Sequence, residues 1–279
     1  MRFDIVTDPA RIARIQKRLA DREQQLKISR GALVRYEMPA LPNPFPRLSR
    51  TLDQENSPHR AQFLGIHYHI GTKDRRIEQL LPAAEYYKFV FRAVADRRYA
   101  LELGFGRLRE LERWIQQYYN QVREPTLRTE QPSFRVVDKV YALKSEVGGI
   151  LLLVRGTLDT IATLMHFLYG PGSAHFTTFA AFVNSLNKRP AAAADADPVL
   201  SEYIETHLKW FRVLREYHDY VTHYGSIDIS FYAPQEGVVR TYLQDALAVH
   251  EAVAPVLPAL DSFYEFLDGH FAGRMTGTA

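Results

Sequence analysis

Cysteine is absent from this chain of 279 residues. Its absence excludes disulfide bonds, a thiolate nucleophile and zinc sites built on cysteine. A chain without disulfides suits a reducing compartment, so a cytoplasmic location is expected. Any chemistry that the protein carries out must therefore come from other side chains.

The chain also has no long uninterrupted apolar segment. The residues from Met1 to Val6 contain no apolar run of the length that a signal peptide requires. The most apolar stretch, residues 150–168, is interrupted by Arg155, Gly156 and Asp159. These interruptions predict a buried helix rather than a membrane span, and no membrane association is expected.

Charge is unevenly distributed along the chain, although the formal net charge is only +3. Residues 1–130 hold 24 Lys and Arg against 16 Asp and Glu, whereas residues 131–279 hold 11 against 16. Pro125 and Pro132 flank this change, which predicts a basic N-terminal region at 1–130 and a second domain at 131–279. A basic region favours contact with RNA. Attraction between the two halves and a solvated helix face are the alternatives.

Helical periodicity dominates the pattern of apolar residues, which predicts an all-α fold. The region between 32 and 73 is partly proline-rich and cannot form a continuous helix. Pro82 is expected to kink a helix or to start a new one, and Gly104 is expected to break one. Short strands are expected at 61–70 and 227–232. The predicted helices are 8–28, 74–103, 107–122, 138–169, 177–186, 198–224, 237–254 and 260–271.

Small side chains recur every seven residues along the predicted helix 138–169, at Ala142, Gly149, Gly156 and Thr163. A glycine inside a helix costs about 1 kcal/mol relative to alanine. Close packing is a reasonable compensation, so this seam predicts the near approach of a second helix, within the chain or between chains.

Several charged or titratable side chains that could take part in catalysis recur at helical spacing between Leu214 and Gly225. Arg215, Asp219 and His223 follow one another at steps of four residues, which places them on one helix face. Asp219 can orient the ring of His223 and leave its other nitrogen for acid–base work, and His218 lies beside this face. The alternative is structural, because a surface Arg–Asp pair contributes at most ~1 kcal/mol. A histidine near a helix C-terminus is also favoured by the helix dipole alone.

A two-helix pattern within residues 135–270 resembles the HEPN superfamily of helical RNA-processing and nucleotide-binding domains. The resemblance implies an up-and-down helical bundle, preceded here by the helical, partly proline-rich N-terminal region, and a homodimer. The residues that carry it are Glu146, Arg155, Leu158-Asp159 and Ile161-Ala162 on the first helix, and Trp210, Leu214-Arg215, His218-Asp219 and His223-Tyr224-Gly225 on the second.

Family members with nuclease activity carry an arginine, then a polar residue, then a histidine four to six residues further on. Asp219 and His223 match the polar residue and the histidine, but His218 stands at the position of the arginine. Arg215 is separated from His223 by seven residues, which lies outside the family spacing. The resemblance implies that the arginine holds the scissile phosphate while the histidine assists cleavage by the ribose 2′-hydroxyl. A histidine lacks the bidentate fork of a guanidinium.

The resemblance therefore implies an RNA-binding protein or a metal-independent endoribonuclease, of a bacterial defence or toxin–antitoxin type with a companion protein. An inactive helical dimerisation module is the alternative. The candidate catalytic residues are His223, Asp219, His218 and Arg215, and the candidate RNA-binding residues are Arg11, Arg14, Arg18, Arg97 and Arg98.

No cofactor is expected. His67 and His69 would share one face of a strand, but the sequence offers no third ligand nearby, so no metal site is predicted. Haem ligation by a histidine such as His166 or His250 is a further reading that no feature of the sequence selects.

Overall fold

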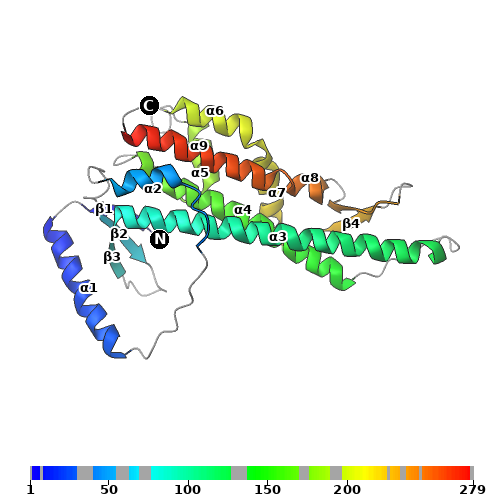
Figure 1. Cartoon of the computed structure of the whole chain (residues 1–279), viewed down its shortest axis with the longest axis horizontal. Helices are drawn as coiled ribbons and strands as arrows, with labels where there is room; N and C mark the ends of the chain where they lie inside the picture. Colours follow the sequence, from blue (N-terminus) through cyan, green and yellow to red (C-terminus); the bar gives the residue numbers. More distant parts are fainter. Residues whose placement is uncertain are drawn as a thin grey trace. The chain divides into compact units, whose positions relative to one another are not determined.

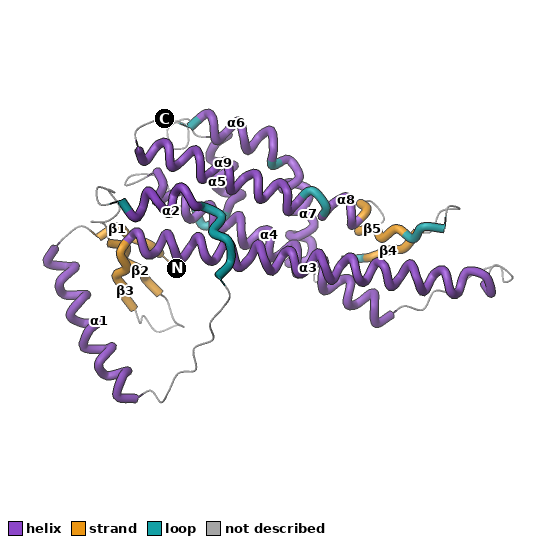
Figure 2. Tube along the Cα trace, viewed as in Figure 1, coloured by secondary structure: helices purple, strands orange, loops and turns teal. Residues whose placement is uncertain are grey.

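The chain is mostly helical in a computed structural model, as the sequence predicts (Figure 1). The structure describes residues 2–6, 9–29, 40–54, 63–68, 77–126, 137–169, 176–188, 197–224, 227–232, 237–244 and 247–276. Two small sheets accompany the helices. The all-α expectation is therefore confirmed for the bulk of the described chain, with short strands added to it (Figure 2).

The chain divides into two compact units. Residues 1–95 and 264–279 form the first unit, and residues 96–263 form the second. Two long helices, α3 (Ala83–Thr126) and α9 (Val256–Thr276), each belong to both units. This division differs from the domain boundary predicted near residue 130, because the helices on either side of that position belong largely or wholly to the second unit.

A three-stranded antiparallel sheet lies in the first unit, in the order β1-β2-β3. Its strands are β1 (Arg2–Val6), β2 (Phe63–Tyr68) and β3 (Ile77–Pro82), and helix α1 (Pro9–Ser29) contacts β3. Strand β2 and helix α1 confirm the strand and the first helix predicted there. Residues 77–82 were predicted to be helical and are a strand, because pairing with β2 overrides their helical spacing.

Short helix α2 (Pro46–Asp53) is anchored to the part of α9 that belongs to the first unit. The carboxylate of Asp268 accepts hydrogen bonds from the backbone N–H groups of Arg47 (3.0 Å) and Leu48 (2.8 Å). These N–H groups have no partner inside a helix that begins at residue 46. Asp268 is only 4% exposed. It thus acts as the N-cap of α2, although it lies more than two hundred residues further along the chain.

The second unit is built on α4 (Val137–Tyr169), which contacts both α5 (Phe179–Lys188) and α7 (Lys209–Tyr224). Helix α6 (Pro198–His207) contacts α7. A second antiparallel sheet has the order β4-β5-β6 and is contacted by α8 (Val249–Val253). Its strands are β4 (Ile229–Tyr232), β5 (Arg240–Leu243) and β6 (Leu247–Ala248).

Phe179, the first residue of α5, lies at the centre of the aromatic core of this unit. Its ring centroid is 5.3 Å from that of Phe211, 5.9 Å from that of Phe182 and 5.9 Å from that of Phe263. These separations fall within the range of favourable edge-to-face and tilted contacts. Helices α5, α7 and α9 therefore share one packed cluster of rings.

Glycines allow α3 and α4 to approach each other. A Cβ atom at Gly104 would lie 3.2 Å from Ile150 Cγ1, so a larger residue would force the Ile150 side chain to shift. Gly104 was predicted to break a helix and instead lies inside α3, because its function is close packing rather than termination. On the predicted seam of small residues, Gly156 faces the guanidinium of Arg97, whereas no described atom lies within 4 Å of a Cβ at Gly149.

Three further predictions concern helix ends and the last third of the chain. Asp197 caps α6 as predicted, since its side chain accepts from the N–H of Leu200 at 3.1 Å. The single helix predicted for 198–224 is wrong, because the chain turns at buried Leu208 and divides into α6 and α7. The helix predicted for 237–254 is also wrong in its first part, because residues 240–243 and 247–248 form β5 and β6, and α8 begins at Val249. Strand β4 confirms the strand predicted at 227–232.

One described stretch, Asp138–Met165 of α4, is long and apolar enough to cross a membrane by length and composition. Half of its most apolar window is buried inside the protein. The core helix of a soluble protein passes the same test.

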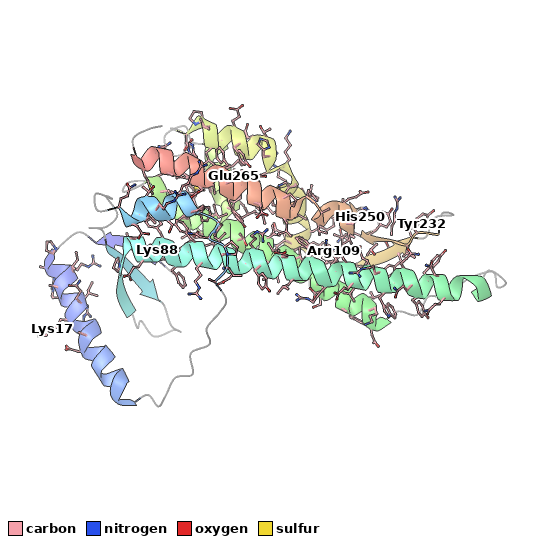
Figure 3. The ribbon with its side chains drawn as sticks, in the orientation of Figure 1. Lys17, Lys88, Arg109, Tyr232, His250 and Glu265 are labelled. Atoms are coloured by element: carbon pink, nitrogen blue, oxygen red, sulfur yellow. The ribbon has the colours of Figure 1, made fainter. Side chains whose placement is uncertain are left out.

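We predict that Asp268→Ala lowers the free energy of unfolding by about 2 kcal/mol, because it leaves two N–H groups of α2 without their acceptor. Urea unfolding of the purified chain measures this change. Glu265→Ala is the matched control, since Glu265 is an exposed carboxylate on the same helix (Figure 3) and its loss should change stability by less than about 0.5 kcal/mol. Equal effects of the two substitutions would contradict the capping role.

Candidate functional site

Arg155 of α4 reaches across to α7 and brings the two helices together at the candidate site. Its Nη1 atom donates a hydrogen bond to Oδ1 of Asp219 and lies 2.6 Å from Nδ1 of His218. Both partners belong to the cluster that the sequence singled out on α7. An arginine from a neighbouring helix therefore stands beside the histidine that occupies the arginine position of the sequence motif.

Asp159 holds the other side of this guanidinium. Its Oδ2 atom lies 3.7 Å from Nε of Arg155, one turn earlier on the same helix. Its Oδ1 atom accepts a hydrogen bond from the backbone N–H of Phe179 at 2.8 Å. Because Phe179 is the first residue of α5, Asp159 fixes the start of α5 and the position of Arg155 at once.

The ring of His218 is almost fully enclosed, with 7% of the residue exposed. Its Nδ1 atom lies 2.6 Å from Nη1 of Arg155 and 3.2 Å from Oδ1 of Asp219. A guanidinium only donates hydrogen bonds, whereas a carboxylate only accepts them. Nδ1 can therefore accept from Arg155 or donate to Asp219, but it cannot do both in one protonation state.

Asp219 is the carboxylate on which the positive charges converge. Besides Arg155 it faces Arg215, whose Nε atom lies 3.5 Å from Oδ2 of Asp219. Partial burial raises the pKa of Asp219, but the hydrogen bonds and positive charges of its neighbours lower that pKa by a larger amount. The net effect is a pKa below the ordinary value, so Asp219 is an anion at neutral pH.

The structure thus places three of the four candidate catalytic residues in one cluster: Arg215, His218 and Asp219. The predicted pairing of Arg215 with Asp219 is confirmed at 3.5 Å. His223 lies within α7, one turn after Asp219, and its side chain lies outside the part of the chain that the structure describes. Its predicted hydrogen bond to Asp219 therefore stays a prediction.

A pocket of about 400 Å³ opens beside this cluster, where α5, α6 and α7 meet. Arg215 and Asp219 form part of its lining, while His218 does not belong to the lining. The ion pair of Arg215 with Asp219 therefore faces a space large enough for a small organic group or a single nucleotide unit.

The five arginines predicted to bind RNA fall into two groups. Arg97 donates to the carbonyl oxygen of Gly156 and to Oγ1 of Thr160. Arg98 forms a two-pronged ion pair with Asp261, with Nε–Oδ1 at 2.7 Å and Nη2–Oδ2 at 2.9 Å, and this pairing raises its pKa. Both side chains therefore have partners inside the second unit, which weakens their assignment to RNA.

The other three arginines lie on α1 in the first unit. Arg11, Arg14 and Arg18 line a hollow of about 610 Å³ together with Lys17, which Figure 3 labels on this helix. Asp21 is the one acidic residue of this lining. Four cations against one carboxylate give α1 the kind of surface that attracts a polyanion.

The histidines considered for a metal lie mostly outside the described chain. His67 belongs to β2, but neither its side chain nor His69 is described, so their common face stays a prediction. Among the described residues, no group of three or more His, Cys, Asp or Glu side chains has the arrangement of a metal site.

Arg155 is the residue of this site that sequence reasoning did not assign to it. Its sequence signal was an arginine directly after an apolar run, since residues 150–154 are Ile, Leu, Leu, Leu and Val. A half-buried charge in such a position requires a partner. That requirement points to a carboxylate on a facing helix, but only the packing of α4 against α7 identifies Asp219 as the partner.

Comparison with protein-family models gave no match to the chain. Comparisons with curated proteins and with solved structures gave none either. The arguments about function therefore come from the residues and their geometry.

We predict that Asp219→Asn lowers the free energy of unfolding at pH 7. The difference in this free energy between the wild type and the variant should narrow as the pH falls below 3.8, the ordinary pKa of aspartate. A carboxylate whose pKa is lowered by folding stabilises the folded state at every pH above its pKa in the unfolded chain. That stabilisation disappears as the pH falls through the pKa of the same group in the folded chain. Urea unfolding at a series of pH values measures it. Glu216→Gln is the control, because Glu216 is an exposed neighbour that forms no ion pair with any described residue. A difference that is independent of pH would contradict the assignment.

Proposed function

We propose that this protein is a HEPN-like RNA-binding protein that cleaves RNA without a metal ion. The observation that carries the proposal is the contact of Arg155 with both His218 and Asp219. It brings a guanidinium from a neighbouring helix onto the α7 motif, where it holds the two motif residues that precede His223. An arginine, an acidic residue and, one turn further along α7, His223 then belong to one region of two packed helices.

The proposed reaction is transfer of the phosphodiester to the neighbouring ribose 2′-hydroxyl. His223 removes the proton of the 2′-hydroxyl, whose oxygen attacks phosphorus. The bond from phosphorus to the 5′-oxygen breaks, and the leaving oxygen takes up a proton from water, while the proton held by His223 returns to the solvent. The products are a 2′,3′-cyclic phosphate and a free 5′-hydroxyl, so the step needs no oxidant, reductant or further reactant. A guanidinium is suited to the charge that develops on the phosphate oxygens.

Arg215 is the guanidinium best placed to meet the phosphate. It lines the pocket beside the cluster, and its separation of 3.5 Å from Asp219 makes a looser pair than the contact of Arg155 with the same carboxylate. Arg155 is then a positioning residue that fixes Asp219 and His218. The buried ring of His218 supports the packing of the two helices rather than acid–base work.

The four cations along α1 suit a role in holding the RNA backbone. Phosphate contacts dominate the affinity of such complexes and make it depend on salt. A homodimer and a companion protein of a toxin–antitoxin system belong to the same proposal, because they follow from the HEPN resemblance alone.

An inactive helical interaction module is the second candidate. One observation favours it: the guanidinium of Arg155 is already paired with two carboxylates, those of Asp159 and Asp219. Charges that neutralise one another between two packed helices can have a purely structural role. In this case the purified protein leaves RNA intact while it forms a defined oligomer.

We predict that His223→Ala abolishes RNA cleavage, because it removes the base that activates the 2′-hydroxyl. Cleavage of a labelled RNA is measured in the presence of EDTA, together with the same RNA carrying 2′-deoxyribose at the cleaved position. His250→Ala is the matched control, since His250 is an exposed histidine of α8, outside this cluster (Figure 3). Full activity of His223→Ala, or cleavage of the deoxy substrate, would overturn the catalytic proposal.

We also predict that the affinity for RNA falls steeply as the salt concentration rises, and that phosphate contacts of α1 account for part of this salt dependence. The double variant Arg14→Ala/Lys17→Ala removes two exposed cations of α1. If each contacts one phosphate, the slope of log K against log salt should fall by about 1.4, from about 0.7 for each contact with a single strand. Arg109→Ala/Arg113→Ala on α3 is the control of equal charge. An unchanged slope in the α1 variant would remove this helix from the binding surface.

A further inference from the structure

The pocket between α5, α6 and α7 carries features that the proposed cleavage step does not use. It exists because the chain turns at Leu208, which ends α6 and lets α7 begin in a new direction. The side chain of Leu208 is buried, and its backbone accepts a hydrogen bond from the N–H of Phe211 at 3.0 Å. The corner is therefore held by packing and by a backbone hydrogen bond.

One side of the pocket is apolar. Ala180 and Val183 of α5 and Ile204 of α6 line it, with the buried rings of Phe179 and Phe211 behind. These rings belong to the packed aromatic cluster of the second unit, so this wall has little freedom to move. A flat, weakly polar group gains most from such a wall, because it buries apolar surface without losing hydrogen bonds.

The rim of the same pocket is charged. Lys209 and Arg212 of α7 are exposed and form no ion pair with any described residue. The carboxylates of Glu205 and Glu216 are also exposed, and the described chain offers neither of them a cationic partner within ion-pair distance. Cations that suit a phosphate and carboxylates that suit N–H donors therefore surround one apolar wall.

We propose that this pocket receives one unstacked nucleotide of the bound RNA, with its base against the apolar wall and a phosphate at Lys209 and Arg212. The volume of about 400 Å³ accommodates a single nucleotide unit. Carboxylates accept hydrogen bonds from exocyclic amino groups of bases. The pocket therefore selects single-stranded RNA. It selects adenine, guanine or cytosine over uracil, which has no amino group and whose single N–H lies between two carbonyl oxygens that repel a carboxylate.

This inference rests on the proposed function for the identity of the polymer, and on the pocket itself for the nucleotide. It makes the pocket a determinant of specificity beside the proposed cleavage site, since Arg215 and Asp219 line it as well. An unpaired base that enters the pocket would hold the neighbouring phosphate near Arg215. Duplex RNA keeps its bases stacked and cannot offer one.

The test uses the full chain and isothermal titration calorimetry. The ligands are AMP, GMP, CMP and UMP, together with ribose 5-phosphate and inorganic phosphate as probes without a base. We expect the three nucleotides with amino groups to bind at least about tenfold more tightly than ribose 5-phosphate, phosphate or UMP. Equal binding of phosphate and nucleotides would overturn the base site, and so would equal binding of UMP and GMP.

Two variants locate the site. Ala180→Leu fills the pocket from α5 and should weaken nucleotide binding about tenfold, while Ala181→Leu, on the exposed next position outside the lining, should not. Arg212→Ala removes an exposed cation of the rim and should weaken nucleotide binding about tenfold, while Arg109→Ala on α3 should not. Arg212 is exposed and unpaired among the described residues, so its variant keeps the test decisive if Ala180→Leu fails to fold.

The two proposals fail in different ways. RNA binding that survives in Arg212→Ala, with no competition by GMP, would overturn the nucleotide pocket and leave the proposed function standing. Binding of GMP that depends on Arg212, in a protein that binds no RNA, would support the pocket and overturn the proposed function. Weaker binding of single-stranded than of duplex RNA would overturn the pocket's role in selecting RNA.

Discussion

The guanidinium of Arg155 is the group on which the geometry of the candidate site depends. It follows an apolar run of α4 and is paired with Asp159 on its own helix and with Asp219 on α7. A half-buried cation without such partners would cost several kcal/mol. The need to neutralise it therefore fixes the position of α7 against α4. Asp159 extends this control to α5, because it also accepts from the first N–H of that helix.

The surrounding features follow from this arrangement. With α5 and α7 both tied to α4, the turn at Leu208 leaves an open corner between α5, α6 and α7, and this corner is the pocket. Arg215 and Asp219 connect the ion-pair cluster to the pocket lining. A charge network that stabilises the helix packing can thus also hold a binding surface in place. Removal of one member would leave the opposite charge uncompensated, so fold and site depend on the same residues.

Helical periodicity was sufficient to predict α1, α4 and α5, and the buried residues of α4 do recur with the helical period. It failed where pairing between distant segments decides the structure. Residues 77–82 carry helical spacing but pair with β2. Residues 240–243 pair with β4, and residues 247–248 pair with 240–243 in turn. Gly104 misled in another way, since the same residue that breaks an isolated helix also allows two helices to pack closely.

The sequence by itself determined the helical class, the cap at Asp197 and the cluster of Arg215, His218 and Asp219, because these depend on spacing within one segment. Only the tertiary structure decided which group stands beside His218. Arg155 is sixty-three residues away in the sequence, and no local pattern pairs it with α7. The tertiary structure also decided that Arg97 and Arg98 have partners within the protein, since their acceptors lie on α4 and α9. Long-range ion pairs depend on helix packing, and packing is a property of the folded chain.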